Sequence, residues 1–254
     1  MKEEWRLLIT EDNNAAVNMA IDKAVMVANS EGKILPTVRF YTWNPPAISI
    51  GYFQSLVDEV DLDVCKNLGV DYVRRITGGG AVFHDAELTY SIVISESHPE
   101  IPKNIMDSYA RICGAVIKGL NSLGIDSKYA PINDIVTNGK KISGNAQTRK
   151  LKTILQHGTV LMDVDVDKMF CLLKVPDEKI RDKLISDVKE RVTSINHVLK
   201  KHLSFSDVSK AMKIGFEKEF NINLVKGKLT NEEISLAKKF EKECFLSKEW
   251  NHKK

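Results

Sequence analysis

Residues 74–85 read Arg-Arg-Ile-Thr-Gly-Gly-Gly-Ala-Val-Phe-His-Asp, with three consecutive glycines between a pair of arginines and an apolar run. Glycine adopts positive φ without steric cost, so this backbone can curl and direct successive amide groups toward one point. Such a nest favours an anion, and the preceding arginines can add charge-assisted hydrogen bonds. The apolar residues that follow predict a ligand with one charged and one apolar end. The alternative is a glycine-rich hairpin turn whose arginines lie in solvent.

Composition restricts the class of protein. The 254 residues suffice for one large domain or two small ones, and the net charge of +3 comes from lysines scattered among acids. A nucleic-acid-binding protein usually concentrates basic residues on one face, so no nucleic acid partner is expected. No apolar run has the length needed to cross a bilayer, and the N-terminus lacks the core of a signal peptide. We therefore expect a cytoplasmic protein without a membrane partner.

The chain has four cysteines, at positions 65, 113, 171 and 244, and none of them forms a CxxC pair. This spacing indicates neither a zinc site nor a thioredoxin-like redox motif, and it leaves the metal-binding residues unknown. Cys113 and Cys171 fall in helical patterns beside apolar residues, where buried, inert thiols are common.

The hydrophobic pattern predicts an α+β fold with a mostly antiparallel sheet flanked by helices. Strands are expected at 6–10, 38–43, 47–51, 88–94, 129–136, 140–146 and 153–162, and Asn138-Gly139 predicts a type I′ hairpin turn. Helices are expected from Asn13 or Asn14 to about Gly32, at 62–67, at 105–123 before Gly124, and after the capping box Thr230–Glu233, with Ile234, Ala237 and Phe240 facing inward. Residues 1–254 are interpreted as one catalytic domain, rich in strands over 1–163 and in helices over 164–254.

Two further polar clusters fall on neighbouring predicted strands. Asn133-Asp134 precedes Lys140-Lys141-Ile142-Ser143-Gly144-Asn145-Ala146 across the predicted hairpin, and Gln156-His157-Gly158-Thr159 follows. Alternation along a strand predicts that Lys141, Ser143 and Asn145 share one face. An inward ammonium there could lie between a phosphate and a carboxylate and offset their repulsion. The alternatives are an exposed strand lysine for Lys141 and a hydrogen-bonded core histidine for His157.

Some well-known catalytic motifs are absent from the sequence. It contains no GxxxxGK[ST] phosphate loop, no GxSxG elbow and no HExxH helix. A nucleotide, if bound, would therefore bind through the atypical glycine segment.

The motifs, in their order and spacing, resemble those of the lipoate–protein ligase family. That family has two arginines, Ser or Thr, three glycines, Ala-Val, an aromatic residue and His-Asp, as at residues 74–85. Its Asn-Asp pair, its Lys-aliphatic-Ser-Gly-x-Ala run and its His-Gly-Thr strand are matched at 133–134, 141–146 and 157–159. The similarity extends from Asn18 to Asn251. It implies the fold of the class II synthetases and the biotin and lipoate ligases.

The resemblance implies a ligase that activates lipoate with Mg·ATP to lipoyl-adenylate and transfers the lipoyl group to a protein lysine. The acceptor would be a lipoyl domain of a 2-oxoacid dehydrogenase or the glycine-cleavage H protein. By position, Lys141 would contact the α-phosphate and the lipoyl carbonyl. The residues implied for binding ATP and the adenylate are Arg75, Thr77, Gly78, Gly79, Gly80, Asn133, Asp134, Gly144 and Ala146. Those implied for the lipoyl pocket are Val82, His84, His157 and Gly158.

The sequence departs from the family pattern in two ways. Full-length members carry an accessory C-terminal domain, and this chain ends soon after Trp250, so we expect a separate small partner protein to complete adenylation. Related octanoyl transferases use a cysteine that in one branch precedes the central lysine, whereas residues 130–134 contain none. Because a thiol is the better nucleophile for thioester exchange, this absence favours the ATP route. The alternatives are a cysteine-dependent octanoyl or lipoyl transferase and a non-catalytic module that binds lipoate or a nucleotide.

Overall fold

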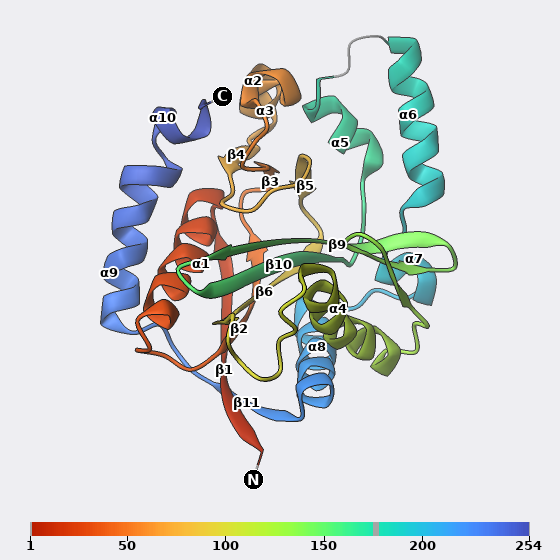
Figure 1. The fold of residues 1–254 in the computed structure, drawn as a ribbon. Helices are drawn as coiled ribbons and strands as arrows, with labels where there is room; N and C mark the ends of the chain where they lie inside the picture. Colours follow the sequence, from red (N-terminus) through yellow and green to blue (C-terminus); the bar gives the residue numbers. More distant parts are fainter. Residues whose placement is uncertain (1, 175–177, 254) are drawn as a thin grey trace.

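A large sheet of eight strands forms the centre of the computed structural model, which describes residues 2–174 and 178–253 (Figure 1). In spatial order its strands are β11 (Ile222–Lys226), β1 (Glu3–Asn13), β2 (Thr37–Trp43), β6 (Glu87–Ser95), β10 (Thr153–Leu161), β9 (Lys140–Lys150), β8 (Asp134–Thr137) and β7 (Lys128–Ala130). Strand β1 pairs in parallel with β11 and β2, and the remaining pairs are antiparallel. The predicted α+β class with a mostly antiparallel sheet is confirmed.

A smaller sheet positions the glycine segment. It consists of β4 (Asp71–Arg74), β3 (Ala47–Ile50) and β5 (Val82–His84), with β3 in the middle. Because β4 ends at Arg74 and β5 begins at Val82, the glycines form the loop between the two outer strands. The loop is therefore fixed at both ends by hydrogen-bonded backbone.

Helices cover both faces of the large sheet (Figure 1). Helices α4 (Ile105–Ser122) and α8 (Phe205–Phe220) pack on one face, and α1 (Ala15–Ser30) and α9 (Asn231–Phe240) lie on the other. The shorter elements are α2 (Leu56–Glu59), α3 (Leu62–Leu68), α5 (Val166–Leu172), α6 (Glu178–Arg191), α7 (Ile195–Leu199), the π-helical turn η1 (Glu241–Phe245) and α10 (Lys248–Asn251). Among the described residues, no helix has both the length and the apolar character needed to span a bilayer.

Local sequence signals explain most element boundaries. The Asn14 side chain caps α1 by accepting a hydrogen bond from the Val17 amide, and Gly124 takes a φ of +84° after α4. Asn138 and Gly139 both have positive φ, as the predicted hairpin turn requires. One prediction within α9 is wrong, because the Ile234 side chain is 39% exposed. Short helices with one buried stripe leave such neighbouring positions in solvent.

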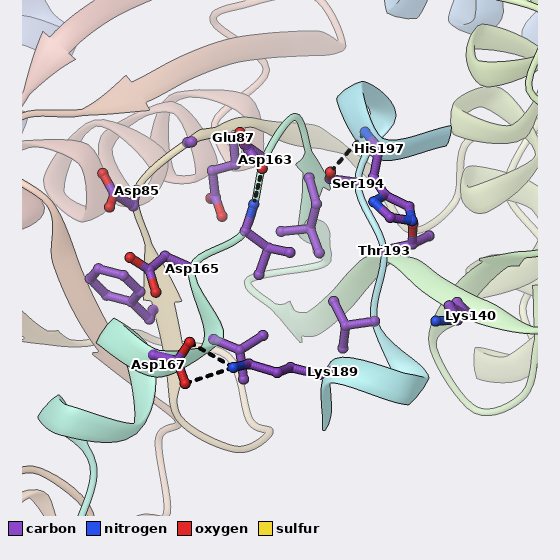
Figure 2. Close-up of a pocket in the computed structure, with 16 residues that line it drawn as sticks. Asp85, Glu87, Lys140, Asp163, Asp165, Asp167, Lys189, Thr193, Ser194 and His197 are labelled. Carbon is purple, nitrogen blue, oxygen red and sulfur yellow. Dashed lines mark hydrogen bonds and ion pairs between the residues drawn. The ribbon is translucent and has the colours of Figure 1, made fainter. Parts of the chain in front are cut away.

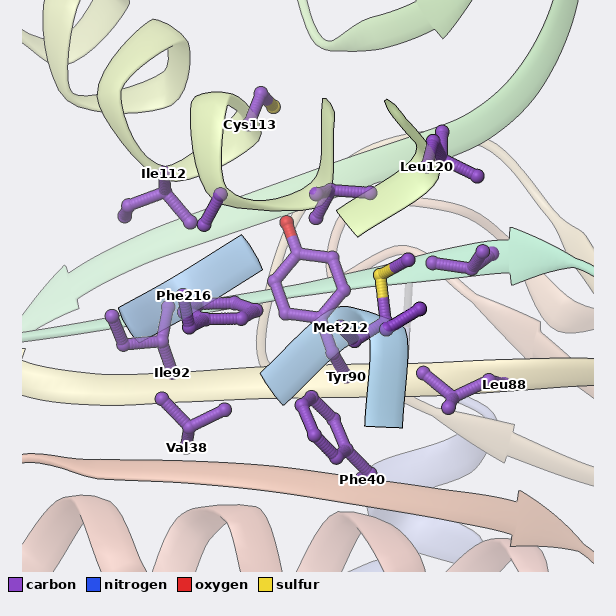
Figure 3. Packing of buried hydrophobic residues seen from close by; sticks show 14 of the residues in the cluster. Val38, Phe40, Leu88, Tyr90, Ile92, Ile112, Cys113, Leu120, Met212 and Phe216 are labelled. Carbon is purple, nitrogen blue, oxygen red and sulfur yellow. The ribbon is translucent and has the colours of Figure 1, made fainter. Parts of the chain in front are cut away.

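The core between the sheet and the α4/α8 pair combines aliphatic and aromatic side chains in close packing (Figure 3). Tyr90 from β6 and Phe216 from α8 are fully buried, with ring centroids 5.6 Å apart. The two helices approach closely where glycines face each other. A β-carbon added at Gly215 would lie 2.1 Å from the Ala115 carbonyl oxygen and 2.5 Å from the Gly119 amide nitrogen. The backbone contact therefore requires glycine at position 215.

We predict that Gly215→Ala destabilises the protein by about 1–3 kcal/mol, the usual cost of overpacking. The sign is informative, because alanine in a helix interior normally gains roughly 0.5–1 kcal/mol over glycine. Urea unfolding at equilibrium measures the change, with Asn121→Ala, exposed on α4, as the control. A Gly215→Ala protein as stable as the parent would contradict the close approach of α4 and α8.

Candidate active site

A cavity of about 320 Å³ lies between the large sheet and the glycine loop. Its size falls within the range of pockets for small ligands. Among its lining residues are these predicted site residues: Arg75, Gly79, Gly80, Val82, His84, Asn133, Lys141, Gly144, Ala146, His157 and Gly158. The fold thus gathers residues from four predicted motifs around one space, which we call the acyl pocket. Its other walls are mainly apolar side chains, including Met19, Tyr41, Trp43, Leu161, Val164, Met169, Val188 and Val192.

Three predicted site residues lie just behind the lining. The Thr77 side chain is fully buried, and its Oγ1 is 2.7 Å from Nε2 of His157. The Gly78 carbonyl oxygen accepts a hydrogen bond from Arg75 at 2.9 Å. Asp134 lies beside the pocket, where its Oδ1 is 2.8 Å from Nζ of Lys141. Each of the three thus contacts one residue that lines the pocket: His157, Arg75 and Lys141, respectively.

Arg75 holds the glycine loop in place. Its Nη2 donates to the carbonyl oxygens of Gly78 (2.9 Å) and Gly80 (2.7 Å), and its Nη1 donates to the Ser49 carbonyl and hydroxyl oxygens. Burial of the guanidinium lowers the pKa of Arg75 to about 10. Arg75 therefore donates four hydrogen bonds to oxygens of the protein. These donors position the glycine loop and are not free to bind a ligand.

The expectation that both arginines face an anion is wrong for Arg74. Its guanidinium is buried and donates to backbone carbonyls, among them those of Gln54, Trp250 and Asn251. Arg74 instead ties the C-terminal segment to β4 and to the turn after β3. An unpaired buried charge is costly, so these carbonyl contacts are what allow the arginine to be buried.

The glycine loop is shaped by close packing more than by a nest of amides. Of its three glycines only Gly79 has positive φ, at +101°. A β-carbon at Gly51 would lie 1.9 Å from the Gly79 carbonyl oxygen, so the loop backbone presses directly on the end of β3. Arg75 holds the loop in this position, and a side chain at position 51 would collide with it. Glycine is therefore needed both at Gly51 and at Gly79.

A bulge in β9 sets the position of Lys141. Strand β8 pairs Ile135 with Ser143 and Val136 with Lys141, so Ile142 has no partner. A β-carbon at Gly144 would lie 2.8 Å from both Cε and Nζ of Lys141. Lys141 therefore shares its face with Gly144, and the predicted shared face of Lys141, Ser143 and Asn145 is wrong, because the extra residue reverses the alternation.

A buried polar network supports the floor of the pocket. Asp22 accepts hydrogen bonds from Arg39 (2.7 Å), Ser91 (2.9 Å) and Tyr41 (3.2 Å), and its Oδ2 lies 3.4 Å from Nδ1 of His157. Burial lowers the pKa of His157 below its usual range, and the carboxylate of Asp22 opposes that shift only in part. A neutral His157 then donates from Nδ1 to Asp22 and accepts from the Thr77 hydroxyl at Nε2.

A second relay runs along the wall of the pocket. Because Arg75 can only donate, Ser49 accepts from it and donates its own proton to Nε2 of His84 at 2.7 Å. Nδ1 of His84 then donates to Oε1 of Glu87 at 2.7 Å. The Trp43 ring stacks on His84 with centroids 4.0 Å apart.

Four further residues of the site, Asp22, Trp43, Ser49 and Glu87, were not among those predicted from the sequence. Two of them left a detectable signal. Asp22 is the one acid on the buried, mainly apolar face of α1, and Glu87 follows the predicted histidine His84 by three residues. The other two reach the site only through the pairing of strands.

The matching family model places the chain in a known family of enzymes. The chain belongs to the lipoyl protein ligase A/B catalytic domain family, whose model matches residues 14–217. Octanoyltransferase LipM of Brevibacillus brevis is 37% identical, over 98% of this chain and 99% of that protein. Octanoyltransferase LipM of Clostridioides difficile is 38% identical, over 99% of each chain.

Solved structures confirm the fold of the biotin and lipoate ligases. A bi-partite lipoate protein ligase from Thermoplasma acidophilum has a TM-score of 0.90 and 33% identity, over 98% of this chain and 96% of its own. A lipoate-protein ligase A bound with ATP has a TM-score of 0.84 and 31% identity, over 98% of each chain.

The curated relatives correct the expected reaction. Proteins 36–39% identical to this chain over nearly their whole length are octanoyltransferases, so an ATP-dependent lipoate ligase is the wrong prediction. The expected ATP, Mg²⁺ and lipoate are corrected with it. The physical reason is that the shared motifs build a mainly apolar pocket with a lysine at its side. Such a pocket does not by itself specify how an acyl group is activated.

We predict that His157 makes the protein less stable as the pH falls. The unfolded histidine, with a pKa of about 6.5, binds a proton that the buried residue resists, so the free energy of unfolding should fall as pH decreases from 7 to 5. One such group contributes a slope of at most about 1.4 kcal/mol per pH unit. Urea unfolding across this range should give a smaller slope for His157→Gln than for the parent, and an unchanged slope for the exposed control His202→Gln. Equal slopes for the parent and His157→Gln would contradict a neutral, buried His157.

Proposed function

We propose that this protein transfers an octanoyl group from a thioester to the ε-amine of a lysine on a lipoyl domain or H protein in the cytoplasm. The observation that carries the proposal is the Lys141 ammonium at the side of a mainly apolar cavity of about 320 Å³. The octanoyltransferase relatives support the choice of acyl group. The conclusion rests on this match between pocket and acyl chain.

The apolar walls supply the binding energy for the chain. Trp43, Val82 and Leu161 line the cavity, and burial stabilises an acyl chain by about 0.8 kcal/mol per methylene. The polar groups of the lining are largely occupied by one another, as in the Ser49–His84 and Thr77–His157 contacts. An octanoyl chain therefore meets few unsatisfied polar atoms along the walls.

Lys141 supplies the charge for the reacting carbonyl. Attack on a thioester places negative charge on the carbonyl oxygen, and a positioned cation stabilises that charge in the transition state. The ion pair with Asp134 holds the ammonium 2.8 Å from one carboxylate oxygen, while the side chain remains 40% exposed. The ammonium is thus held near the pocket and remains accessible to a substrate. Gly144 leaves the space that the Lys141 side chain occupies.

The cysteines favour direct transfer over an acyl-cysteine intermediate. Cys65, Cys113 and Cys244 are buried, and burial raises the pKa of the Cys113 thiol to about 12. Cys171 is exposed on α5, and none of the four cysteines, all of which lie in the described part of the chain, lines the acyl pocket. We therefore propose that the acceptor amine attacks the thioester itself.

We predict that Lys141→Met lowers the rate of octanoyl transfer by about 100- to 1,000-fold, the usual loss when one group that stabilises an oxyanion is removed. The assay combines an octanoyl thioester with an unmodified lipoyl domain and reads the acceptor's mass, without ATP or lipoate. Lys128→Met, on the exposed strand β7, is the matched control. Undiminished transfer by Lys141→Met would remove Lys141 from the mechanism, and a strict requirement for ATP would refute the thioester donor.

Removal of the thiols tests direct transfer. We expect Cys171→Ser, and the buried cysteines changed singly to alanine, to keep rates within about twofold of the parent, because no thiol touches the reacting atoms. Intact-protein mass spectrometry after incubation with the thioester alone should show no acyl adduct on the enzyme. An adduct that disappears with one cysteine, together with loss of transfer, would show an acyl-cysteine route.

A further inference from the structure

A second hollow, of about 540 Å³, adjoins the acyl pocket. Figure 2 shows the side chains that line this second hollow. The two cavities share the side chains of Phe83, Leu161, Val164 and Val192 as a common wall. Val192 also forms an isolated bridge with Lys141, and the Thr193 amide donates to the Lys141 carbonyl oxygen at 2.8 Å. The second hollow therefore extends to the backbone of Lys141, whose ammonium lies at the side of the acyl pocket.

The hollow is rich in carboxylates. Those that line it belong to Asp85, Glu87, Asp163, Asp165 and Asp167. Lys168 pairs with Asp85, and Lys189 pairs with Asp167. Within residues 2–174 and 178–253, the side chains of Asp163 and Asp165 accept hydrogen bonds only from backbone amides, those of Val164 and Lys168. Both carboxylates are exposed. The lining also contains the cations Lys140 and Lys189, but the five carboxylates outnumber them, so the hollow retains negative charge that attracts a cation.

Glu87 is the buried carboxylate of this hollow. Its side chain is 1% exposed, and Oε1 accepts hydrogen bonds from both His84 and Thr89. Oε2 is buried and has no hydrogen-bond partner among the described residues. A buried carboxylate oxygen without a donor is costly, because it has lost water and gained nothing in exchange. A donor brought by a substrate would satisfy it.

Strand order brings Glu87 near Lys141. Glu87 pairs with Leu161 across β6 and β10, and Leu161 lines the acyl pocket together with Lys141 of β9, the next strand. The β10–β9 ladder ends at Gly158 and Asn145, and two strand spacings, about 10 Å, separate the backbones of β6 and β9. Side chains from both strands can thus act on one ligand held between them.

We propose that the acidic hollow receives the ε-ammonium of the acceptor lysine and that Glu87 is the general base that deprotonates it. This inference rests on the proposed octanoyl transfer. Carboxylates at the rim, Asp163 and Asp165, draw in the cation, and Oε2 of Glu87 takes one proton. The hollow thereby supplies the nucleophile from one side while the acyl pocket presents the thioester from the other.

The step balances without another reactant. After Glu87 takes the first proton, the neutral amine attacks the thioester carbonyl, so a carbon–nitrogen bond forms and the carbon–sulfur bond breaks. The second proton leaves the nitrogen for the departing sulfur, which is released as a thiol. Glu87 then returns its proton to water. Lys141 stabilises the oxyanion between the two bond changes.

A double-mutant cycle in binding tests the hollow directly. The partners are an unmodified lipoyl domain and its variant with the acceptor lysine changed to methionine, titrated by calorimetry against the parent enzyme, Glu87→Gln and the double variant Asp163→Asn/Asp165→Asn. Asparagine at 165 can still cap α5. We expect loss of the acceptor amine to weaken binding to the parent about tenfold or more, and to weaken binding to both variants much less. Asp58→Asn, outside both cavities, should behave like the parent.

Kinetics test the role of Glu87. Glu87→Gln should lower the turnover rate by about 100-fold or more, the typical contribution of a general base, and should leave octanoyl thioester binding unchanged. A merely structural role would reduce octanoyl thioester binding as well. If Glu87→Gln fails to fold, Asp163→Asn/Asp165→Asn decides, by raising the KM for the acceptor and not for the thioester.

The outcomes separate the two proposals. Equal losses on removing the acceptor amine in the parent and in the variants would overturn the acidic hollow, whatever the reaction. Absence of octanoyl transfer by the parent enzyme, with the binding cycle intact, would overturn the proposed function and leave the acceptor-lysine site standing.

Discussion

The guanidinium of Arg75 is the contact on which the site depends. It joins the Gly78 and Gly80 carbonyl oxygens to Ser49, so one buried side chain fixes the loop against the end of β3. The loop forms one wall of the acyl pocket, and the strands that bracket it carry the pocket's polar relay. A planar fork with several fixed donors suits this task, whereas a lysine could not bind these oxygens in the same arrangement. Pocket shape thus follows from a buried guanidinium whose hydrogen bonds go to oxygens of the protein itself.

Two cavities of opposite character meet at the wall formed by Phe83, Leu161, Val164 and Val192. On one side of the shared wall is an apolar pocket with a single ammonium, and on the other is a hollow lined by carboxylates. Acyl transfer to a lysine brings together an apolar chain and a cationic amine, which cannot share one environment until the amine loses its proton. In the proposed reaction, separate compartments that adjoin near Lys141 would satisfy this constraint. Glu87 is hydrogen-bonded to His84, a residue of the acyl pocket, so the two environments are also linked through buried hydrogen bonds.

Patterns within one element were predictable from the sequence, and contacts between distant elements were not. The Asn138-Gly139 turn and the Gly124 helix end follow from backbone preferences, and the glycine, lysine and histidine motifs do line one cavity. The role of Arg74 was not predictable, because its acceptors include Trp250 and Asn251 at the far end of the chain. The acyl donor was not predictable either, since the shared motifs encode a pocket that is compatible with more than one kind of activated acyl group.

The central claim is that the cavity beside Lys141 binds an acyl chain whose reacting carbonyl lies at that ammonium. The most direct measurement is calorimetric affinity for a series of saturated acyl thioesters from four to ten carbons, all on the same thiol. The account predicts a gain of about 0.8 kcal/mol, roughly fourfold in Kd, for each methylene up to eight carbons, and no further gain beyond the length of the pocket. Affinity that does not depend on chain length would contradict the account, because the chain would then not lie in the cavity.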